Sequence, residues 1–598
     1  MEIYMRKWFS LNWNSLFKSA VLLVFPTIFL FFALPFNRTH FGNDPEFAYL
    51  LNGINIGTLN SVGHTDNPGT TAQIYSAIVL RCAFLAQADK SEGFEKFILR
   101  NADQHIELER KVLIVLNGIV MLVIGIVSFV IMRNIWFSLV LQITPFTSAN
   151  LTEHIFTKVS PEPVLLIVSA ALVLLIISYY FSIKREEKKY ALLFALVSGF
   201  GLATKATFLP LIIIPLLLMS NPMLRKRFLL YLGLFFIVFT LPAVPQYPHM
   251  AKWFLMLLTH TGTYGGGEVG IFNVTEYVGN LVKISFVNPM LSVTSIFSVL
   301  IIFSKLRKST FTSEFKSNSG FRMVTVLAVA QLTGIFMVAK HYHANHYLIP
   351  ELCMLALNWI FIFIYLQEIL PIKYRKAFLY SPILLMMVVM INISMNRNYL
   401  QAANQGYILS NKDYRRMTQL IENEYKGYVC AYYYPASVNP YSALRWGNVY
   451  SRFLHTQVIK EILPDGYFYD IRTFQFSLWD TPVSTSIMRA ISNDKLLIIG
   501  GPVTEIERLR IEHKSGIKLI EVFRGHAQVV YRVSFDSLRY SNEMVKRGVI
   551  SFNKPSMAYI VNDVNGILYK SWYTRLQDIS NYYTADFGSS REPNIPVV

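Results

Sequence analysis

Long apolar runs recur along the first two thirds of this 598-residue chain, from Phe17 to Ser394. An α-helix needs about twenty such residues to cross the hydrocarbon core of a bilayer. Hydrophobic residues make up 53% of the sequence and charged residues only 15%, whereas a soluble domain carries roughly one quarter charged residues. The predicted fold class is therefore a polytopic α-helical membrane protein.

The positions of the basic residues predict an orientation. The formal net charge is +18, and most Lys and Arg lie in short loops between apolar runs. Such loops stay on the cytoplasmic side, which predicts about eleven spans with the amino terminus inside and everything after Met395 outside. One of these spans is predicted near 134–151. The first apolar run, 16–36, is expected to be a retained anchor. Because no basic stripe is interleaved with aromatic residues, a nucleic-acid partner is not expected.

Two regions are expected from these patterns. Residues 1–394 form a transmembrane domain that includes an outer loop, 37–111, with surface helices over 70–88 and 94–108. Residues 395–598 form an extracytoplasmic mixed α/β domain. Its predicted helix covers 412–425 and its predicted strands cover 428–434, 495–499, 517–523 and 527–533. Gly500-Gly501-Pro502 lacks the other residues of a phosphate-binding loop and is interpreted as a turn.

The segment 190–220 predicts a hairpin within the membrane. A single span there would place the basic cluster Arg225-Lys226-Arg227 on the outer side, whereas two short crossings keep it inside. Lys205 then lies at the outer turn. A lone cation at membrane depth should meet an anion, and a lipid phosphate supplies one. The alternative is that Lys205 simply extends to the lipid headgroups.

Acidic residues follow directly after the first span. Asp44-Pro45-Glu46 begins the outer loop, and His64-Thr65-Asp66-Asn67-Pro68-Gly69 follows. Carboxylates beside a membrane are costly unless water, a metal ion or a substrate uses them. As alternatives, Asp44 could cap a helix with Pro45 at its first position, and His64 and Asp66 could belong to a polar turn.

Further polar residues lie at other outer helix boundaries. The second outer loop holds Glu153 and Glu162. Glu153 is preferred for substrate contact because Glu162 lies between two prolines at the entrance of a span. A basic group that could complete a phosphate site consists of Lys340, His341, His343 and His346. Zinc is the weaker interpretation, since these positions share no helical face and no carboxylate lies nearby.

These motifs, in this order, resemble the glycosyltransferase C superfamily of integral membrane enzymes, which includes protein mannosyltransferases and aminoarabinose transferases. Supporting segments are 160–163, 201–205 and 340–350. The resemblance covers roughly residues 1–394, and the final domain matches only by position. It implies transfer of a sugar from a polyprenyl-phosphate carrier to an acceptor hydroxyl at the outer face, usually with inversion.

The resemblance also implies roles for individual residues. An oxocarbenium-like sugar needs a carboxylate base for the acceptor proton, and the departing phosphate needs fixed cations. Asp44 is the preferred base, and Glu46 is the alternative because Pro45 separates the pair. Substrate-binding residues are expected at His64, Asp66, Glu153, Glu162, Lys205, Lys340, His341, His343 and His346. Asp44 and Glu46 could also hold Mg²⁺ or Mn²⁺, but no cofactor is firmly predicted.

The expected partners are a polyprenyl-phosphate sugar donor, membrane lipids, and a glycan, lipid or protein acceptor. The expected location is a bacterial inner (plasma) membrane. Two other functions stay open. A lipid-glycan flippase or transporter would also have many spans, although intramembrane charge is sparse here and no inverted repeat is visible. A glycan polymerase or ligase is the third hypothesis.

Overall fold

The computed structural model describes residues 20–35, 45–87, 91–182, 186–262, 265–271, 273–308, 310–342, 344–371, 381–395, 397–433, 439–471, 473–526 and 528–535. Asp44 and His343 therefore lie outside the described residues. The chain forms two compact units. The helical unit comprises Met1–Phe36, Ile56–Val79 and Glu107–Gln401, and the sheet unit comprises Asn37–Asn55, Leu80–Ile106 and Ala402–Val598.

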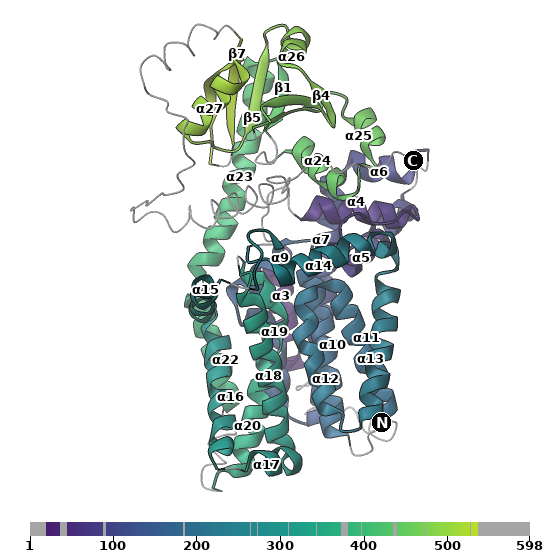
Figure 1. Cartoon of the computed structure of the whole chain (residues 1–598), viewed down its shortest axis with the longest axis vertical. Coiled ribbons are helices and arrows are strands. Elements are labelled where there is room, and N and C mark those ends of the chain that lie inside the picture. Colours follow the sequence, from purple (N-terminus) through teal and green to yellow (C-terminus); the bar gives the residue numbers. More distant parts are fainter. Residues whose placement is uncertain are drawn as a thin grey trace. The chain divides into compact units, whose positions relative to one another are not determined.

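The helical unit is built almost entirely from helices (Figure 1). They are α3 (Val24–Ala33), α7 (Ala102–Met132, which begins in the sheet unit), α8 (Ile135–Gln142), η1 (Thr144–Phe146), α9 (Ala149–Thr157), α10 (Pro161–Phe181), α11 (Glu187–Thr204), η2 (Ala206–Ile212), α12 (Ile213–Leu218), α13 (Pro222–Phe239), η3 (Leu241–Gln246), α14 (Tyr247–Thr259), α15 (Val274–Val287), α16 (Pro289–Arg307), α17 (Phe311–Ser317), α18 (Ser319–Ala339), η5 (Asn345–Leu348), α19 (Ile349–Cys353), α20 (Leu355–Ile369) and α22 (Ser381–Met395).

Several of these helices can cross a membrane. By length and composition, five qualify among the described residues: Ala102–Met132, Pro161–Phe181, Pro289–Arg307, Ser319–Ala339 and Asn345–Ile369. A sixth is added if Pro222–Phe239 and Leu241–Thr259, bent by 86°, count as one broken span. The helices support a multi-pass membrane protein. They do not confirm the predicted number of eleven spans.

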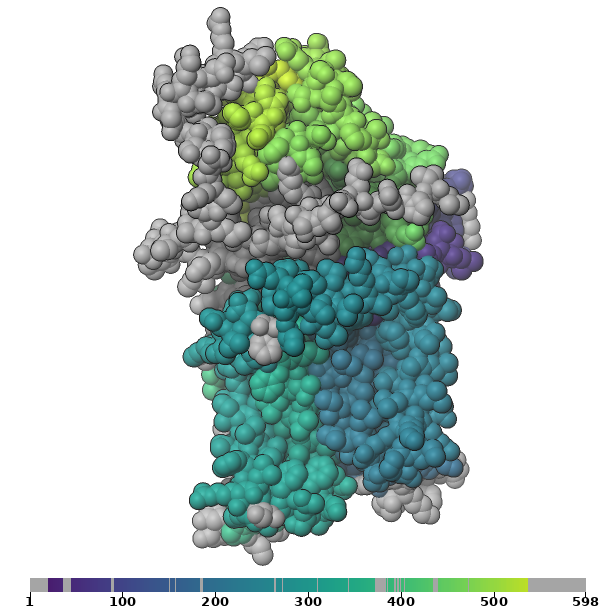
Figure 2. All heavy atoms as spheres, in the orientation of Figure 1, coloured from purple at the N-terminus to yellow at the C-terminus, as the bar shows by residue number. Residues whose placement is uncertain are grey.

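The outer faces of these helices carry large apolar side chains. Leu230 on α13, Phe286 on α15 and Phe303 on α16 are all exposed. In Figure 2 the surface of the helical unit is coloured mainly blue and teal. A soluble surface rarely exposes so many large apolar residues together. Contact with lipid explains this composition.

The hairpin predicted over 190–220 is present. Tyr179 on α10 donates its hydroxyl to Glu187 Oε1 (3.1 Å) at the start of α11 and to the Leu218 carbonyl (3.2 Å) at the end of α12. The start of α11 and the end of α12 therefore lie at the same level. The chain therefore follows α11, turns at Lys205 and returns along η2 and α12.

The single span predicted over 134–151 is wrong. The structure instead has three short elements in this region, α8, η1 and α9. Pro145 lacks the backbone N–H that a continuous helix would use, and Ser148 is extended with φ −146°. The apolar composition indicated burial correctly but did not reveal these breaks.

The sheet unit contains helices α4 (Glu46–Gly57), α5 (Thr70–Ala86), α6 (Phe94–Arg100), α23 (Arg397–Glu424), α24 (Pro440–Tyr450), α25 (Thr456–Ile462), α26 (Thr485–Ser492) and α27 (Glu505–Ser515), of which α4, α5 and α23 are shared with the helical unit. Its strands are β1 (Val429–Tyr433), β2 (Tyr467–Asp470), β3 (Gln475–Leu478), β4 (Thr481–Val483), β5 (Leu496–Gly500), β6 (Lys518–Arg524) and β7 (Val529–Ser534).

These strands form one mixed sheet in the order β4-β3-β2-β1-β5-β7-β6. The central strand β1 pairs in parallel with β2 and β5, and the remaining pairs are antiparallel. The prediction of a mixed α/β domain is confirmed, including the strands that became β1, β5, β6 and β7. Strands β2, β3 and β4 were not predicted, because each has only three or four residues.

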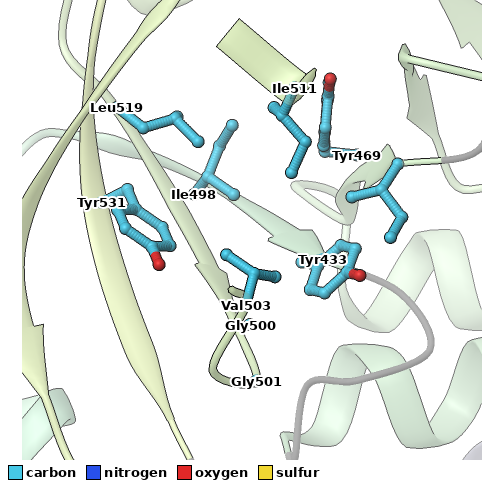
Figure 3. Close-up of a pocket in the computed structure, with 10 residues that line it drawn as sticks. Tyr433, Tyr469, Ile498, Gly500, Gly501, Val503, Ile511, Leu519 and Tyr531 are labelled. Atoms are coloured by element: carbon cyan, nitrogen blue, oxygen red, sulfur yellow. The ribbon is translucent and has the colours of Figure 1, made fainter. Parts of the chain in front are cut away.

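A small pocket lies at the carboxyl ends of β1 and β5 (Figure 3). The rings of Tyr433, Tyr469 and Tyr531 line it together with aliphatic side chains and Gly500-Gly501. A Cβ atom added at Gly500 would lie 2.4 Å from the Tyr433 side chain, so glycine is needed for this close approach. Residues 501–504 connect β5 to α27, so Gly500-Gly501-Pro502 lies where a turn was predicted.

The outer loop 37–111 is divided between the two units. Helix α5 lies where the first surface helix was predicted, over 70–88. The second predicted surface helix, 94–108, is divided at Asn101 between α6 and the start of α7. Within the sheet unit, Lys96 on α6 lies 3.5 Å from Glu461 on α25. His455 Nδ1 lies 2.7 Å from Glu95 Oε1. These contacts join α6 to α25 and to the residue that precedes α25.

Candidate functional site

Lys205 lies at the turn between α11 and η2, where the backbone is extended (φ −159°, ψ 137°). Pro68 forms an antiparallel bridge with Lys205, and Ala206 N donates to the Asn67 carbonyl at 2.7 Å. The segment His64–Gly69 therefore runs alongside the turn. The structure brings together a motif of the outer loop and the cation that the charge pattern singled out.

The Lys205 side chain is only 2% exposed, and its Nζ donates to Glu162 Oε1. Glu162 occupies the first turn of α10, a helix that starts with Pro161, where proline is favoured. The Lys205 ammonium also lies over the ring of Tyr347, with the ring centroid 4.7 Å from Nζ. A buried ion pair is stable only if its geometry compensates for lost hydration, and here two helix ends and an aromatic face provide that geometry.

Two histidines extend this arrangement. His346 Nε2 lies 3.9 Å from Glu162 Oε1, and the rings of His346 and His154 have centroids 5.0 Å apart. His346 belongs to η5, whereas His154 is buried on α9. We refer to Lys205, Glu162, His154, His346 and Tyr347 as the Lys205 cluster. It combines one fixed cation, one carboxylate and two imidazoles that can carry protons.

Three other predicted residues, His64, Asp66 and Glu153, lie in segments that reach the Lys205 cluster. His64 is buried, and its carbonyl accepts a hydrogen bond from Gln73 Nε2 at 2.7 Å. Asp66 is half-buried and directly precedes the Asn67 that bonds to the turn. Glu153 is buried beside His154 on α9. The sequence favoured Glu153 over Glu162 for contact with substrate, but Glu162 is the carboxylate that pairs with Lys205.

Lys340 and His341 contact the carboxyl end of helix α14. Lys340 Nζ donates to the carbonyls of Leu257 (2.6 Å) and Leu258 (2.7 Å), and His341 Nε2 lies 2.7 Å from the Leu257 carbonyl. These carbonyls belong to the last turn of α14, where basic side chains are favourable. Burial lowers the pKa of both Lys340 and His341. Of the predicted basic group, His346 is the described member that joins the Lys205 cluster.

Glu46, the described member of the predicted catalytic pair, belongs to the sheet unit. Glu46 is the first residue of α4 and is 3% exposed. Its position suits a carboxylate at a helix amino terminus. Asp44 lies outside the described residues, so the preferred base stays a prediction. Within the described ranges, no group of three His, Cys, Asp or Glu side chains is arranged to hold a metal ion.

The sequence did not predict a role for two residues of the cluster. His154 follows Glu153 directly, and Tyr347 follows His346 directly. Each belongs to a motif that had been noted for its neighbour. The contact between the two histidine rings depends on how α9 and η5 approach each other. No pattern in the sequence indicates that approach.

No protein-family model and no curated protein sequence matches this chain. Among solved structures, the chain is similar to a crystal structure of ArnT from Cupriavidus metallidurans bound to undecaprenyl phosphate. The match has a TM-score of 0.45 and 11% sequence identity, and it covers 86% of this chain and 97% of that chain. Because so distant a likeness says nothing of chemistry, function has to be inferred from the residues of this chain.

Proposed function

We propose that this protein transfers a sugar from a polyprenyl-phosphate donor to a hydroxyl group of an acceptor at the membrane surface. The observation that carries the proposal is the buried Lys205 ammonium, held at the turn of a helical hairpin beside Glu162 and two histidines. Ionisable groups at membrane depth are rare and usually functional. The anion best suited to such a position is a lipid phosphate.

The cluster has the donors that a phosphate needs. A lysine ammonium has three N–H donors, and among the described residues Glu162 is the side chain that accepts one of them. We infer that the other two donors turn to phosphate oxygens when the lipid binds. We infer that Glu162 balances the charge of Lys205 until the phosphate arrives, and that His346, 3.9 Å from Glu162, then becomes the partner of that carboxylate.

The proposed reaction is a single displacement. The acceptor oxygen attacks the anomeric carbon, the bond from that carbon to the phosphate oxygen breaks, and the proton of the acceptor passes to a carboxylate base. Lys205 stabilises the negative charge that grows on the departing phosphate. Asp44 is the proposed base, with Glu46 as the alternative, and attack from the opposite side inverts the anomeric carbon.

The test uses the full-length protein in lipid with a polyprenyl-phosphate sugar donor. We expect Lys205→Met to abolish transfer and Asp44→Asn to reduce it at least about a hundredfold, as for loss of a general base. The matched control is the double variant Lys205→Met/Glu162→Gln, in which no buried charge is left unpaired. Normal transfer by this double variant, or by both Asp44→Asn and Glu46→Gln, would contradict the proposal.

A divalent cation between Asp44 and Glu46 belongs to the same proposal as an open alternative. Carboxylate oxygens suit Mg²⁺ or Mn²⁺. Chelation would then stop transfer by the wild-type protein, and added Mg²⁺ or Mn²⁺ would restore it. Undiminished transfer in excess chelator would remove the metal from the proposal. Movement of a lipid-linked glycan across the bilayer without a covalent product would instead select a flippase or transporter, and products extended by repeated units would select a polymerase.

A further inference from the structure

A second buried carboxyl group lies inside the helical unit, on α19. Glu351 is 0% exposed and belongs to the candidate span Asn345–Ile369. Neither of its carboxyl oxygens accepts a hydrogen bond from another side chain or backbone group that the structure describes. Burial of an isolated carboxylate without a partner is one of the most unfavourable arrangements in a protein interior.

The neighbouring helix α18 is shaped around this carboxyl group; Figure 1 shows α18 and α19 in the same part of the bundle. A Cβ atom added at Gly334 would lie 1.9 Å from Glu351 Oε1. The absence of a side chain at Gly334 therefore makes the space that the carboxyl group fills. No residue larger than glycine fits there while Glu351 keeps its position.

A chain of buried polar groups leads away from Glu351. Gln331 on α18 donates from Nε2 to the Glu351 carbonyl at 3.3 Å and accepts from Asn358 Nδ2 on α20 at 2.6 Å. Asn358 Nδ2 also lies 3.4 Å from Ser298 Oγ on α16. None of these groups hydrogen-bonds a carboxyl oxygen of Glu351, so the chain stabilises the backbone near Glu351 but leaves its carboxyl group without a donor among the described residues.

The ionisable groups on the helices around α19 do not neutralise it either. Those on the elements that pack against α19 are Glu162, Tyr179 and Tyr180 of α10, His346 and Tyr347 of η5, Arg322 of α18, and Tyr365 and Glu368 of α20. None of them forms a hydrogen bond or an ion pair with Glu351 within the described ranges. η1 and η2 carry no ionisable side chain, and Cys353 is the other such group on α19.

We propose that Glu351 is a proton-binding site inside the helical unit and holds its proton at neutral pH. As a carboxylic acid the group is uncharged and is far less unfavourable to bury than a carboxylate. Protonation also turns one acceptor oxygen into a hydroxyl donor. This inference is independent of sugar transfer, because it rests on Glu351, Gly334 and Gln331 and on no member of the Lys205 cluster.

Infrared spectroscopy of the full-length protein in detergent tests the proposal. The wild-type spectrum minus that of Glu351→Gln should contain the carbonyl stretch of a protonated carboxylic acid at neutral pH. Glutamine has the shape of the neutral acid, so the variant should keep its thermal stability. A difference spectrum with only the two bands of an ionised carboxylate would overturn the proposal.

A second measurement needs no variant. Apolar carbodiimides modify protonated carboxyl groups in apolar surroundings, and peptide mass spectrometry locates the product. We expect modification of Glu351 at neutral pH and none of Glu162, which is also buried but ionised beside Lys205. Recovery of the Glu351 peptide without modification would overturn the proposal.

Discussion

At the scale of single residues, the ion pair of Lys205 and Glu162 is the most sensitive point of the helical unit. Removal of one partner leaves the other charge buried and unpaired, which typically destabilises a protein by about 3–5 kcal/mol. We expect Lys205→Met to lower the thermal unfolding temperature in detergent strongly. Lys205→Met/Glu162→Gln should recover most of the loss, and failure of the second substitution to rescue stability would mean that the two groups are not coupled.

His341 gives a prediction for pH dependence. Burial lowers its pKa in the folded protein, so below the ordinary histidine pKa of about 6.5 the unfolded chain binds a proton that the folded chain does not. The stability is present above this pH and is lost as the pH falls toward the lower folded pKa. Thermal unfolding from pH 7 to acid should therefore show a smaller loss for His341→Gln than for the wild type, and an unchanged profile would contradict this assignment.

Parts of the site followed from single residues. Lys205 was predicted to lie at a hairpin turn and to need an anion. The basic cluster Arg225-Lys226-Arg227 stays on the inner side only if the chain crosses the membrane twice over 190–220, and Lys205 lies between the two crossings. The choice of Glu162 over Glu153 could not be predicted, since it depends on how the start of α10 meets the end of α11. The roles of Asp44 and Glu46 stay predictions.

At the scale of elements, α27 has a capping box. Thr504 Oγ1 accepts from Glu507 N at 3.2 Å, and Glu507 Oε2 accepts from Thr504 N at 2.9 Å. Loss of such a cap typically reduces stability by about 1 kcal/mol. Thr504→Ala should speed hydrogen exchange of the first amides of α27 in the full chain, whereas Thr504→Ser should not. Equal exchange in both variants would show that the cap contributes little.

The length of an element decided whether its sequence revealed it. β1, β5, β6 and β7 have five to seven residues with apolar runs, enough for a periodic pattern to appear. β2, β3 and β4 are shorter, and turns with positive φ at Phe474 and Trp479 separate them. Phe and Trp rarely adopt a left-handed backbone conformation, so neither residue predicts a turn of this kind. The register of the sheet fixes their conformation.

At the scale of the whole molecule, the loop charges predict that the carboxy-terminal region lies on the extracytoplasmic side of the membrane. A cysteine introduced at exposed Lys514 in a Cys82→Ser background should react with an impermeant maleimide in intact cells. Native Cys430 should react slowly, because burial raises the pKa of its thiol to about 11. Reaction at position 514 only after the membrane is opened would reverse the predicted orientation.

The central claim is that Lys205 binds the phosphate of a lipid carrier, and the most direct test is a binding measurement. Full-length protein in detergent is titrated with a polyprenyl phosphate and, separately, with the matching polyprenol, and bound lipid is counted by native mass spectrometry. Loss of one charge-assisted hydrogen bond of about 1.5–3 kcal/mol predicts that Lys205→Met/Glu162→Gln binds the phosphate at least about tenfold more weakly and the polyprenol unchanged. Equal affinity of wild type and double variant for the phosphate would contradict the claim.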